Sequence, residues 1–210
     1  VALLVESHTW ETDGFDSIKG SNADTGFDKD DIVVKLRINS DPSLDGVYHE
    51  LNIKYQESDE SSDQTYVGLA DADFRKDAHS RYGLSAYDNM DNSHETTSFN
   101  YVADFGNLEL SATMYDNDFA RNWFKVDKID NNKIYGHGNG INNIIAAANA
   151  GEATASAILN GTNAEAVEIK LKNNNRAYTS EGTDLKLQYT TENQSLTIGY
   201  RDTEDSEDRF

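Results

Sequence analysis

The stretch IVVKLRINSDPSLDGVYHELNIKYQ, residues Ile32 to Gln56, contains two alternating segments separated by a short polar turn. Every second residue before the turn is apolar: Ile32, Val34, Leu36 and Ile38. The alternation resumes after the turn with His49, Leu51, Ile53 and Tyr55. Because successive side chains of a strand point to opposite faces, this pattern predicts a β-hairpin with one apolar and one polar face.

The same alternation recurs along the chain and predicts about seven strands. Besides the hairpin, the strand segments are 1–10, 97–103, 108–116 with an extension considered through NDFARNWFKV (117–126), 178–190 and 195–201. Short turns at 38–47, 104–107 and 191–194 alternate with long connections at 11–30, 57–96 and 127–175. We expect a helical turn near 70–76 and one or two short helices in the Ala-rich stretch 141–166. The acidic stretch 202–208 does not alternate and is predicted to be a loop.

Composition narrows the class of protein. The formal net charge is −20 and 37% of residues are hydrophobic, which is usual for a disordered chain, but 10% aromatic residues and the repeated alternation argue for a fold. Nucleic-acid binding needs a concentrated basic surface, so we do not expect it. There is no cysteine, and no apolar run long enough for a transmembrane helix. The chain opens on VALLVESHTW, which resembles the middle of a strand, so we expect a fragment of a longer protein.

The alternation of connection lengths favours a transmembrane β-barrel. Such barrels have short turns at the periplasmic end, long loops at the extracellular end, and strands that are apolar toward lipid and polar toward the lumen. The residues expected to face the lumen are Lys35, Arg37, Glu50, Asn52, Lys54, Lys186 and Gln188. Bacterial barrels have an even number of strands, at least eight, so further strands are expected outside this chain. The alternative is an acidic soluble all-β domain of the cell surface that serves in binding or adhesion.

Several motifs, in order along nearly the whole chain, resemble TonB-dependent outer-membrane receptors of the subgroup similar to the ferric dicitrate receptor. They are DGF (Asp13–Phe15), DTGFDKDD (Asp24–Asp31), KLR (Lys35–Arg37), YVGLADADF (Tyr66–Phe74), Arg81 with Tyr82, YDNDFARNW (Tyr115–Trp123), NNRAYTSEG (Asn174–Gly182) and EDRF (Glu207–Phe210). The resemblance implies that residues 1–210 are part of a twenty-two-stranded barrel in the outer membrane of a Gram-negative bacterium.

The resemblance also implies function and partners. The receptor would take up a ferric chelate, either ferric citrate or a siderophore complex, as its transported ligand, with no covalently bound cofactor. The TonB–ExbB–ExbD complex would act through a plug region and TonB box, neither of which we find within 1–210. The barrel wall would contact outer-membrane lipid and lipopolysaccharide.

A small basic island lies within the long connection 57–96. Its members are Arg75, Lys76, His79 and Arg81. Arginine offers a fork that suits carboxylates, so Arg75 and Arg81, with His79, are candidate contacts for an anionic chelate; Arg121, near a strand end, is another. Tyr82 is a candidate for stacking on the chelate. The competing interpretation is that these cations pair with neighbouring aspartates and order the loop.

No enzymatic function is expected. His49-Glu50 lacks the second histidine of a zinc protease helix, and GHGNG at 136–140 lacks the dinucleotide-binding spacing. No nucleophile elbow or P-loop occurs, and no acidic stretch has the spacing of a calcium-binding EF-hand. We therefore expect neither catalytic residues nor a resident metal.

Overall fold

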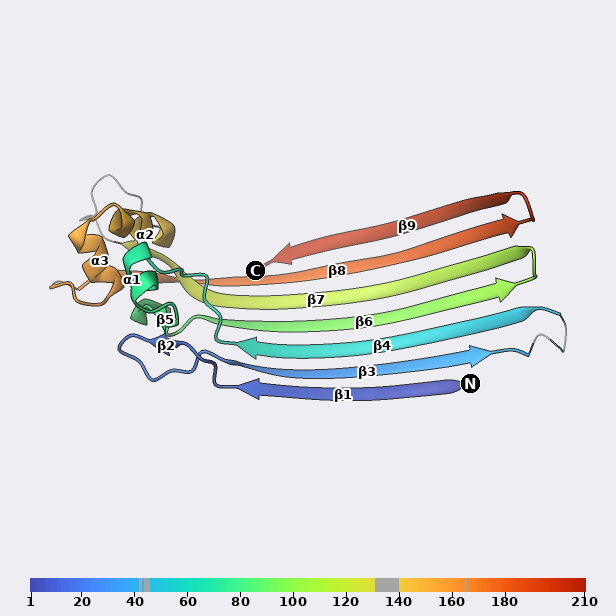
Figure 1. Ribbon diagram of the computed structural model, residues 1–210, viewed down its shortest axis with the longest axis horizontal. Helices are drawn as coiled ribbons and strands as arrows, with labels where there is room; N and C mark the ends of the chain where they lie inside the picture. The colour runs from blue at the N-terminus through green and yellow to red at the C-terminus, as the bar shows by residue number, and fades with distance from the viewer. Residues whose placement is uncertain (42, 44–45, 131–139, 165) are drawn as a thin grey trace.

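A single antiparallel meander forms most of the protein. The computed structural model describes residues 1–41, 43, 46–130, 140–164 and 166–210. The strands of the main sheet are β1 (Ala2–Thr12), β3 (Phe27–Asn39), β4 (Tyr48–Ser62), β6 (Asn89–Asp104), β7 (Leu108–Asp130), β8 (Glu168–Thr190) and β9 (Ser195–Arg209). Each strand pairs with the next of these along the chain, so the sheet order is the sequence order (Figure 1). The all-β class and the number of main strands are as predicted.

The register of the strands places apolar side chains in a band across one face. In the hairpin β3–β4, Val34 is opposite Tyr55 and Leu36 is opposite Ile53, as the alternation predicts. The same face continues through Phe99 on β6 and Met114 on β7. We call this band the apolar belt; from β3 onward it comprises Ile32, Val34, Leu36, Ile38, Leu51, Ile53, Tyr55, Phe99, Tyr101, Ala103, Leu108, Leu110, Ala112, Met114, Leu185, Leu187, Tyr189, Leu196, Ile198 and Tyr200. Many of these side chains are exposed to solvent.

From β3 to β9, the boundary of the apolar belt runs obliquely across the strands; on β1 the last apolar residue of this face is Val5, opposite Val34. On β3 its last apolar residue toward the long connections is Ile32, whereas on β9 it is Tyr200. Tyr200 lies in the cross-strand row of Ile38, which contains Leu51, Tyr101, Ala112 and Leu185. The boundary therefore moves by the six residues between Ile32 and Ile38 over the five strand pairings from β3 to β9.

The two faces of the main sheet differ in charge. Beyond the apolar belt, the same face carries the acidic residues Glu11, Asp28, Asp30, Glu57, Asp59, Asp91, Glu95, Asp116, Asp118, Glu181, Asp202, Glu204 and Asp208. Every lysine and arginine of the seven strands lies on the opposite face, which we call the polar face. Lys35, Arg37, Glu50, Asn52, Lys54, Lys186 and Gln188 share the polar face, as predicted.

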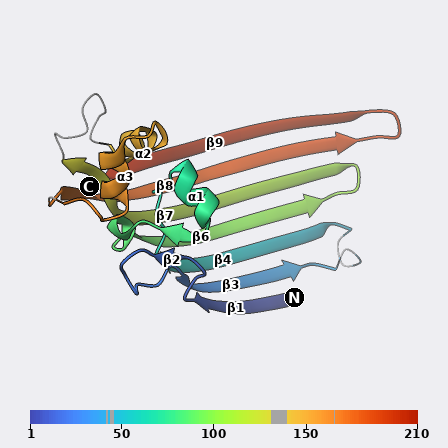
Figure 2. The same cartoon turned by 60° about the vertical axis from the view of Figure 1, so that its left-hand side comes forward.

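Short and long connections lie at opposite ends of the sheet. The short turns 40–47, 105–107 and 191–194 lie at one end, on the right of Figure 1. The described parts of the long connections 13–26, 63–88 and 131–167 lie at the other end, where the helices and a small second sheet gather (Figures 1 and 2). These elements are β2 (Ser17–Ile18), α1 (Asp71–Lys76), β5 (Ser80–Arg81), the 3₁₀ helix η1 (Gly83–Ser85), α2 (Ile141–Asn149) and α3 (Ala153–Leu159). The predicted helical turn and the two short helices are thus confirmed.

The strands extend further toward the long connections than the alternation predicts. The expected loop 57–96 is wrong at both ends, because β4 continues to Ser62 and β6 begins at Asn89. The connection 127–175 is shortened in the same way, and the expected loop at 202–208 belongs to β9. Here both faces are polar, so the alternation disappears although the backbone pairing continues. Cross-strand hydrogen bonds stabilise these ends; Ser61 Oγ, for example, donates to Asp91 at 2.7 Å.

The sheet is open. Among the described residues, the outer edges of β1 and β9 pair with no other strand. These are the first and seventh strands of an antiparallel meander, so both run toward the long connections (Figure 1). The two edges cannot pair with each other in an antiparallel manner. No helix of the described chain is both long enough and apolar enough to cross a membrane.

The compact core lies at the end of the long connections. We call the described parts of connections 13–26, 63–88 and 131–167 the cap. Helices α2 and α3 pack Ile141, Ile144 and Leu159 against Val126 and Ile129 of β7, all 2% exposed or less. Asp88 joins the cap to the sheet, because its carboxylate accepts from the Val126 backbone N–H at 2.8 Å and from Thr65 Oγ1 at 2.6 Å. The main sheet itself has no partner layer among the described residues.

Candidate anion-binding site

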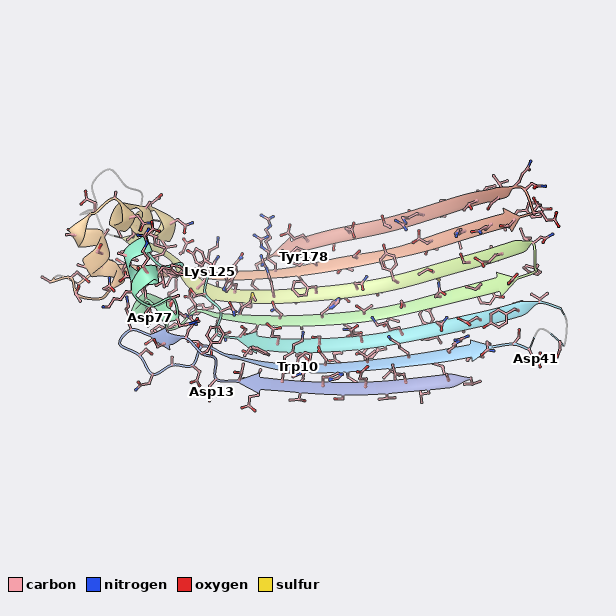
Figure 3. The ribbon with its side chains drawn as sticks, in the orientation of Figure 1. Trp10, Asp13, Asp41, Asp77, Lys125 and Tyr178 are labelled. Carbon is pink, nitrogen blue, oxygen red and sulfur yellow. The ribbon has the colours of Figure 1, made fainter. Side chains whose placement is uncertain are left out.

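Basic side chains oppose one another on the polar face where β7 and β8 approach the cap. Arg121 is opposite Arg176, Lys125 is opposite Lys172, and Lys128 is opposite Lys170. We call these six residues the basic ladder. Arg209 of β9 is opposite Arg176 and extends the first pair into a row of guanidinium groups. In Figure 3, Lys125 lies at the end of the sheet that carries the cap, and Tyr178 lies further along the sheet toward the short turns.

The strand register creates this concentration of positive charge. Like charges directly opposite each other in a sheet destabilise it. The ladder repeats that arrangement in a chain with a net charge of −20. A bound anion would remove the repulsion, so the geometry favours an anionic ligand at this position.

Internal acids neutralise the ladder incompletely. Glu207 serves two guanidinium groups, at 2.8 Å from Arg176 Nη1 and 3.0 Å from Arg209 Nε. The Nε atom of Arg121 is buried and has no hydrogen-bond partner among the described atoms. Lys172 is exposed, and no ion pair joins it to the described part of the chain. The exposed ammonium group of Lys172 therefore remains available to a carboxylate or similar anion, and the guanidinium group of Arg121 is not fully hydrogen-bonded within the described chain.

Aromatic rings alternate with cations along the ladder. Lys125 Nζ lies 4.0 Å from the ring centroids of both Tyr66 and Trp123, and Trp123 Nε1 donates to the Gln64 carbonyl at 3.3 Å. Burial lowers the pKa of Lys125, and the neighbouring Lys172 lowers it further. Lys125 thus holds the connection 63–88 against β7 by cation–π contact. This leaves Arg121, Arg176 and Lys172 as the principal residues for ligand contact.

The residues predicted from sequence are distributed between the cap and the ladder. Arg75 is exposed on α1 and forms no ion pair with the residues that the structure describes. His79 is exposed, with its Nδ1 3.5 Å from Asp16 Oδ1 and its ring edge-on to Phe15. Both reach solvent, but they are not on the polar face of the sheet. Of the predicted candidates, only Arg121 belongs to the ladder.

Arg81 and Tyr82 are part of the cap core. Arg81 is 7% exposed and donates to the backbone carbonyls of Asp63 at 2.7 Å and Ser85 at 3.4 Å. Tyr82 is 1% exposed; its hydroxyl donates to Asp73 at 2.7 Å and accepts from the Ala70 N–H at 3.0 Å. In this conformation neither side chain is available to a ligand. Their contacts agree with the competing interpretation, in which these residues order the loop. Burial opposes ionisation and lowers the pKa of Arg81.

Comparison with known proteins identifies no relative. No protein-family model matches the chain, and no curated protein or solved structure does so either. Among the described residues, no group of three or more His, Asp or Glu side chains is placed to hold a metal ion. The geometry of this chain is therefore the basis on which a function can be proposed.

Sequence reasoning missed Lys125, Lys172, Arg176 and Arg209 as members of one site. Arg121 and Arg176 are far apart in the sequence and meet only through the β7–β8 register. The available signal was their position within two strands of alternating polarity. The extension of 108–116 through 117–126 reached Arg121 and Lys125, but the expected strand at 178–190 began after Arg176, whereas β8 begins at Glu168. Extending both strands would have brought the six basic residues together.

The ionisation of Tyr82 is predicted to make the stability of the cap depend on pH in the alkaline range. Burial raises the pKa of its phenol to about 12. Below its ordinary pKa near 10, the phenol is protonated in both folded and unfolded states and contributes no pH dependence. Between about pH 10 and 12 the unfolded state loses the proton first, so stability falls as pH rises, by roughly 2–3 kcal/mol in total.

Absorbance at 295 nm measures this titration directly. The wild type should contain one tyrosine that ionises about two pH units above the ordinary value, and Tyr82→Phe should lack it. Tyr82→Phe should also remove the corresponding part of the stability loss in urea titrations above pH 10. An unchanged late titration in the variant would show that another tyrosine is responsible.

Proposed function

We propose that this chain is part of the barrel wall of a TonB-dependent outer-membrane receptor that takes up a ferric chelate. The observation that carries the proposal is the oblique boundary of the apolar belt. With about 3.3 Å per residue and 4.8 Å between strands, the six-residue shift corresponds to roughly 20 Å along the strands over roughly 24 Å across them. The boundary is therefore inclined by about 40°.

This inclination matches the tilt of strands in a closed barrel. Transmembrane barrels tilt their strands by about 35–45° from the axis, so a belt that follows the plane of a membrane crosses successive strands at shifted residues. A sandwich core has no reason to end along such a line. The segregation of connections to opposite ends supports the same orientation, with the short turns in the periplasm and the cap outside the cell.

The open edges require further strands if the sheet is to close. Because β1 and β9 run in the same direction, an antiparallel barrel needs an odd number of additional strands, which makes the total even. Fifteen strands would complete the twenty-two of large outer-membrane transporters. In such a receptor the TonB–ExbB–ExbD complex would act on a plug inside the barrel, against the polar face.

The two charged regions then have different partners. The polar face would line the lumen, where the basic ladder faces an anionic ferric chelate such as ferric citrate or a siderophore complex. Arg75 and His79 of the cap remain candidate contacts for the chelate on the extracellular side. The acidic residues beyond the apolar belt would lie at the level of lipopolysaccharide head groups, whose phosphates they can approach only with divalent cations between them.

Dependence on detergent tests the proposal. The purified protein should need detergent to remain dispersed and should float with phospholipid vesicles in a density gradient. A monomer that is soluble in buffer without detergent would instead identify an acidic soluble β domain of the cell surface and would contradict the membrane assignment.

A further inference from the structure

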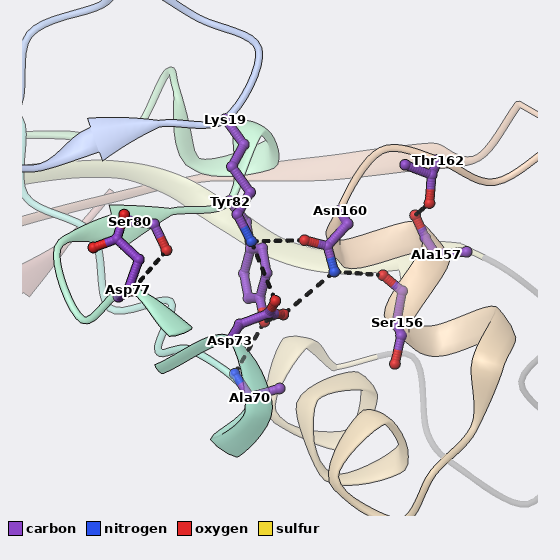
Figure 4. A network of polar contacts seen from close by, with 10 residues as sticks. All are labelled: Lys19, Ala70, Asp73, Asp77, Ser80, Tyr82, Ser156, Ala157, Asn160 and Thr162. Carbon is purple, nitrogen blue, oxygen red and sulfur yellow. Dashed lines mark hydrogen bonds and ion pairs between the residues drawn. The ribbon is translucent and has the colours of Figure 1, made fainter. Parts of the chain in front are cut away.

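The three long connections meet in one polar network. Lys19, from connection 13–26, donates through Nζ to Asn160 Oδ1 at 2.6 Å and lies 3.4 Å from Asp73 Oδ1 (Figure 4). Asp73 belongs to connection 63–88 and also accepts from Tyr82 Oη at 2.7 Å and from Asn160 Nδ2 at 3.3 Å. Asn160 belongs to connection 131–167. One carboxylate, one ammonium and one amide thus join all three connections.

Backbone contacts link the same segments. Strands β2 and β5 pair in parallel, Ser17 N–H donates to the His79 carbonyl, and Lys19 N–H donates to the Arg81 carbonyl, each at 2.9 Å. Asp71 N–H at the start of α1 donates to Asn149 Oδ1 at 2.8 Å, which joins α1 to the end of α2. The network around Asp73 is therefore one of several joints between the connections.

The helices of the connections are short. Helix α1 has six residues, none of them buried, and α3 has seven. Isolated helices of this length are not stable in water, because nucleation is costly and few hydrogen bonds follow it. The apolar cluster that buries α2 and α3 contains residues of connection 63–88 and of β7, so these helices depend on surfaces outside their own connection.

Apolar packing between the connections is incomplete beside the network. A cavity of about 240 Å³ lies there, lined by Lys19, Leu84, Ile129, Ile158, Leu159 and Val167, among other residues. The hydrogen bond between Lys19 and Asn160 therefore lies at the edge of the apolar cluster, beside this cavity. The Lys19 side chain is only 33% exposed and lies over the Tyr82 ring at 4.9 Å, so solvent screens its pair with Asp73 only in part.

We propose that the cap opens and closes as one cooperative unit, with Lys19, Asp73 and Asn160 as its latch. Loss of the latch at any one residue loosens all three connections together, whereas the main sheet keeps its hydrogen bonds. The inference depends on the contacts within the cap and not on the proposed transport function.

Hydrogen–deuterium exchange on the full 210-residue chain in detergent micelles tests the latch. Lys19→Met removes the ammonium group and keeps the aliphatic stem. We expect amides of all three connections, including those of α1 and α3, to exchange faster by the same factor, about 10- to 100-fold, because one shared opening equilibrium governs them. Amides at the centres of β4, β6 and β7 should change less than 2-fold.

Matched variants separate the latch from a local effect. Lys76→Met removes an exposed lysine of α1 and should change no segment by more than 2-fold. Asn160→Ala, at the other end of the network, should give the same shared pattern as Lys19→Met, and Lys19→Arg should restore most of the protection. Faster exchange confined to connection 13–26, no change, or equal loss of protection in the sheet would each overturn the proposal. If Lys19→Met does not fold, the Asn160→Ala and Lys19→Arg results decide the question.

Discussion

Ala112→Arg will destabilise the sheet in a lipid bilayer by about 2–4 kcal/mol, whereas Ser111→Arg will cost about 0–1 kcal/mol. The two residues are neighbours on β7, similar in size and partly exposed, but they lie on opposite faces. Ala112 is within the apolar belt, in the row that contains Tyr101 and Leu185. If that face meets hydrocarbon, a charged side chain there loses its hydration; on the polar face it does not.

Reversible urea unfolding of the receptor in phospholipid vesicles measures this difference, and a third variant separates lipid from a protein core. Ala112→Leu adds apolar volume, which lipid accommodates without cost. In the packed core of a sandwich the same change would cost about 1–3 kcal/mol by overpacking. Equal effects of Ala112→Arg and Ser111→Arg, or a clear loss for Ala112→Leu, would argue against a lipid-facing belt.

Arg121→Gln and Arg176→Gln will each weaken binding of an anionic ferric chelate by about 10- to 100-fold. A hydrogen bond to a charged partner is typically worth about 1.5–3 kcal/mol, and glutamine keeps most of the side-chain volume but not the charge. The two guanidinium groups are cross-strand neighbours, so both can contact one ligand. The affinity of the wild-type receptor for the chelate, measured by calorimetry, should also fall as the salt concentration rises.

Arg201→Gln is the matched control for the ladder. Arg201 lies on the same polar face of the sheet but near the short turns, where its Nη2 is 3.0 Å from Asp184 Oδ2. This substitution should change chelate affinity less than 3-fold. Arg75→Ala in the same assay tests the candidate contact on α1. Undiminished binding by both ladder variants would remove the ladder from the ligand site.

Alternation predicted the sheet where one face is apolar, and failed where both faces are polar. Ile32 to Gln56 forms the expected hairpin because its apolar side chains mark one face. The ends of β4, β6 and β9 carry mainly polar residues on both faces, so backbone pairing and cross-strand contacts such as Ser61 to Asp91 identify them. Predicting these strand ends would have required the positions of the neighbouring strands, and a local sequence pattern does not contain them.

The candidate site was predictable only in part for a related reason. Arg81 and Tyr82 have residue types suited to a ligand, but Tyr82 is buried in the cluster that includes α2 and α3, and Arg81 donates to the carbonyls of Asp63 and Ser85. Arg176 gave no local sign of a site, because its significance comes from Arg121 on another strand. The chemistry of each side chain was visible in the sequence. Its exposure to solvent and its neighbours on other strands became visible only in the tertiary structure.

Fluorescence quenching by brominated lipids tests the membrane assignment most directly. The chain has no cysteine, so a single label can be attached at Leu187→Cys in the apolar belt, at Lys186→Cys on the polar face, or at Asp118→Cys among the acidic residues. In vesicles that contain phospholipid with brominated acyl chains, we expect strong quenching at position 187 and little at 186 or 118, because only the apolar belt faces the acyl chains. Equal quenching at 186 and 187, or none at 187, would contradict it.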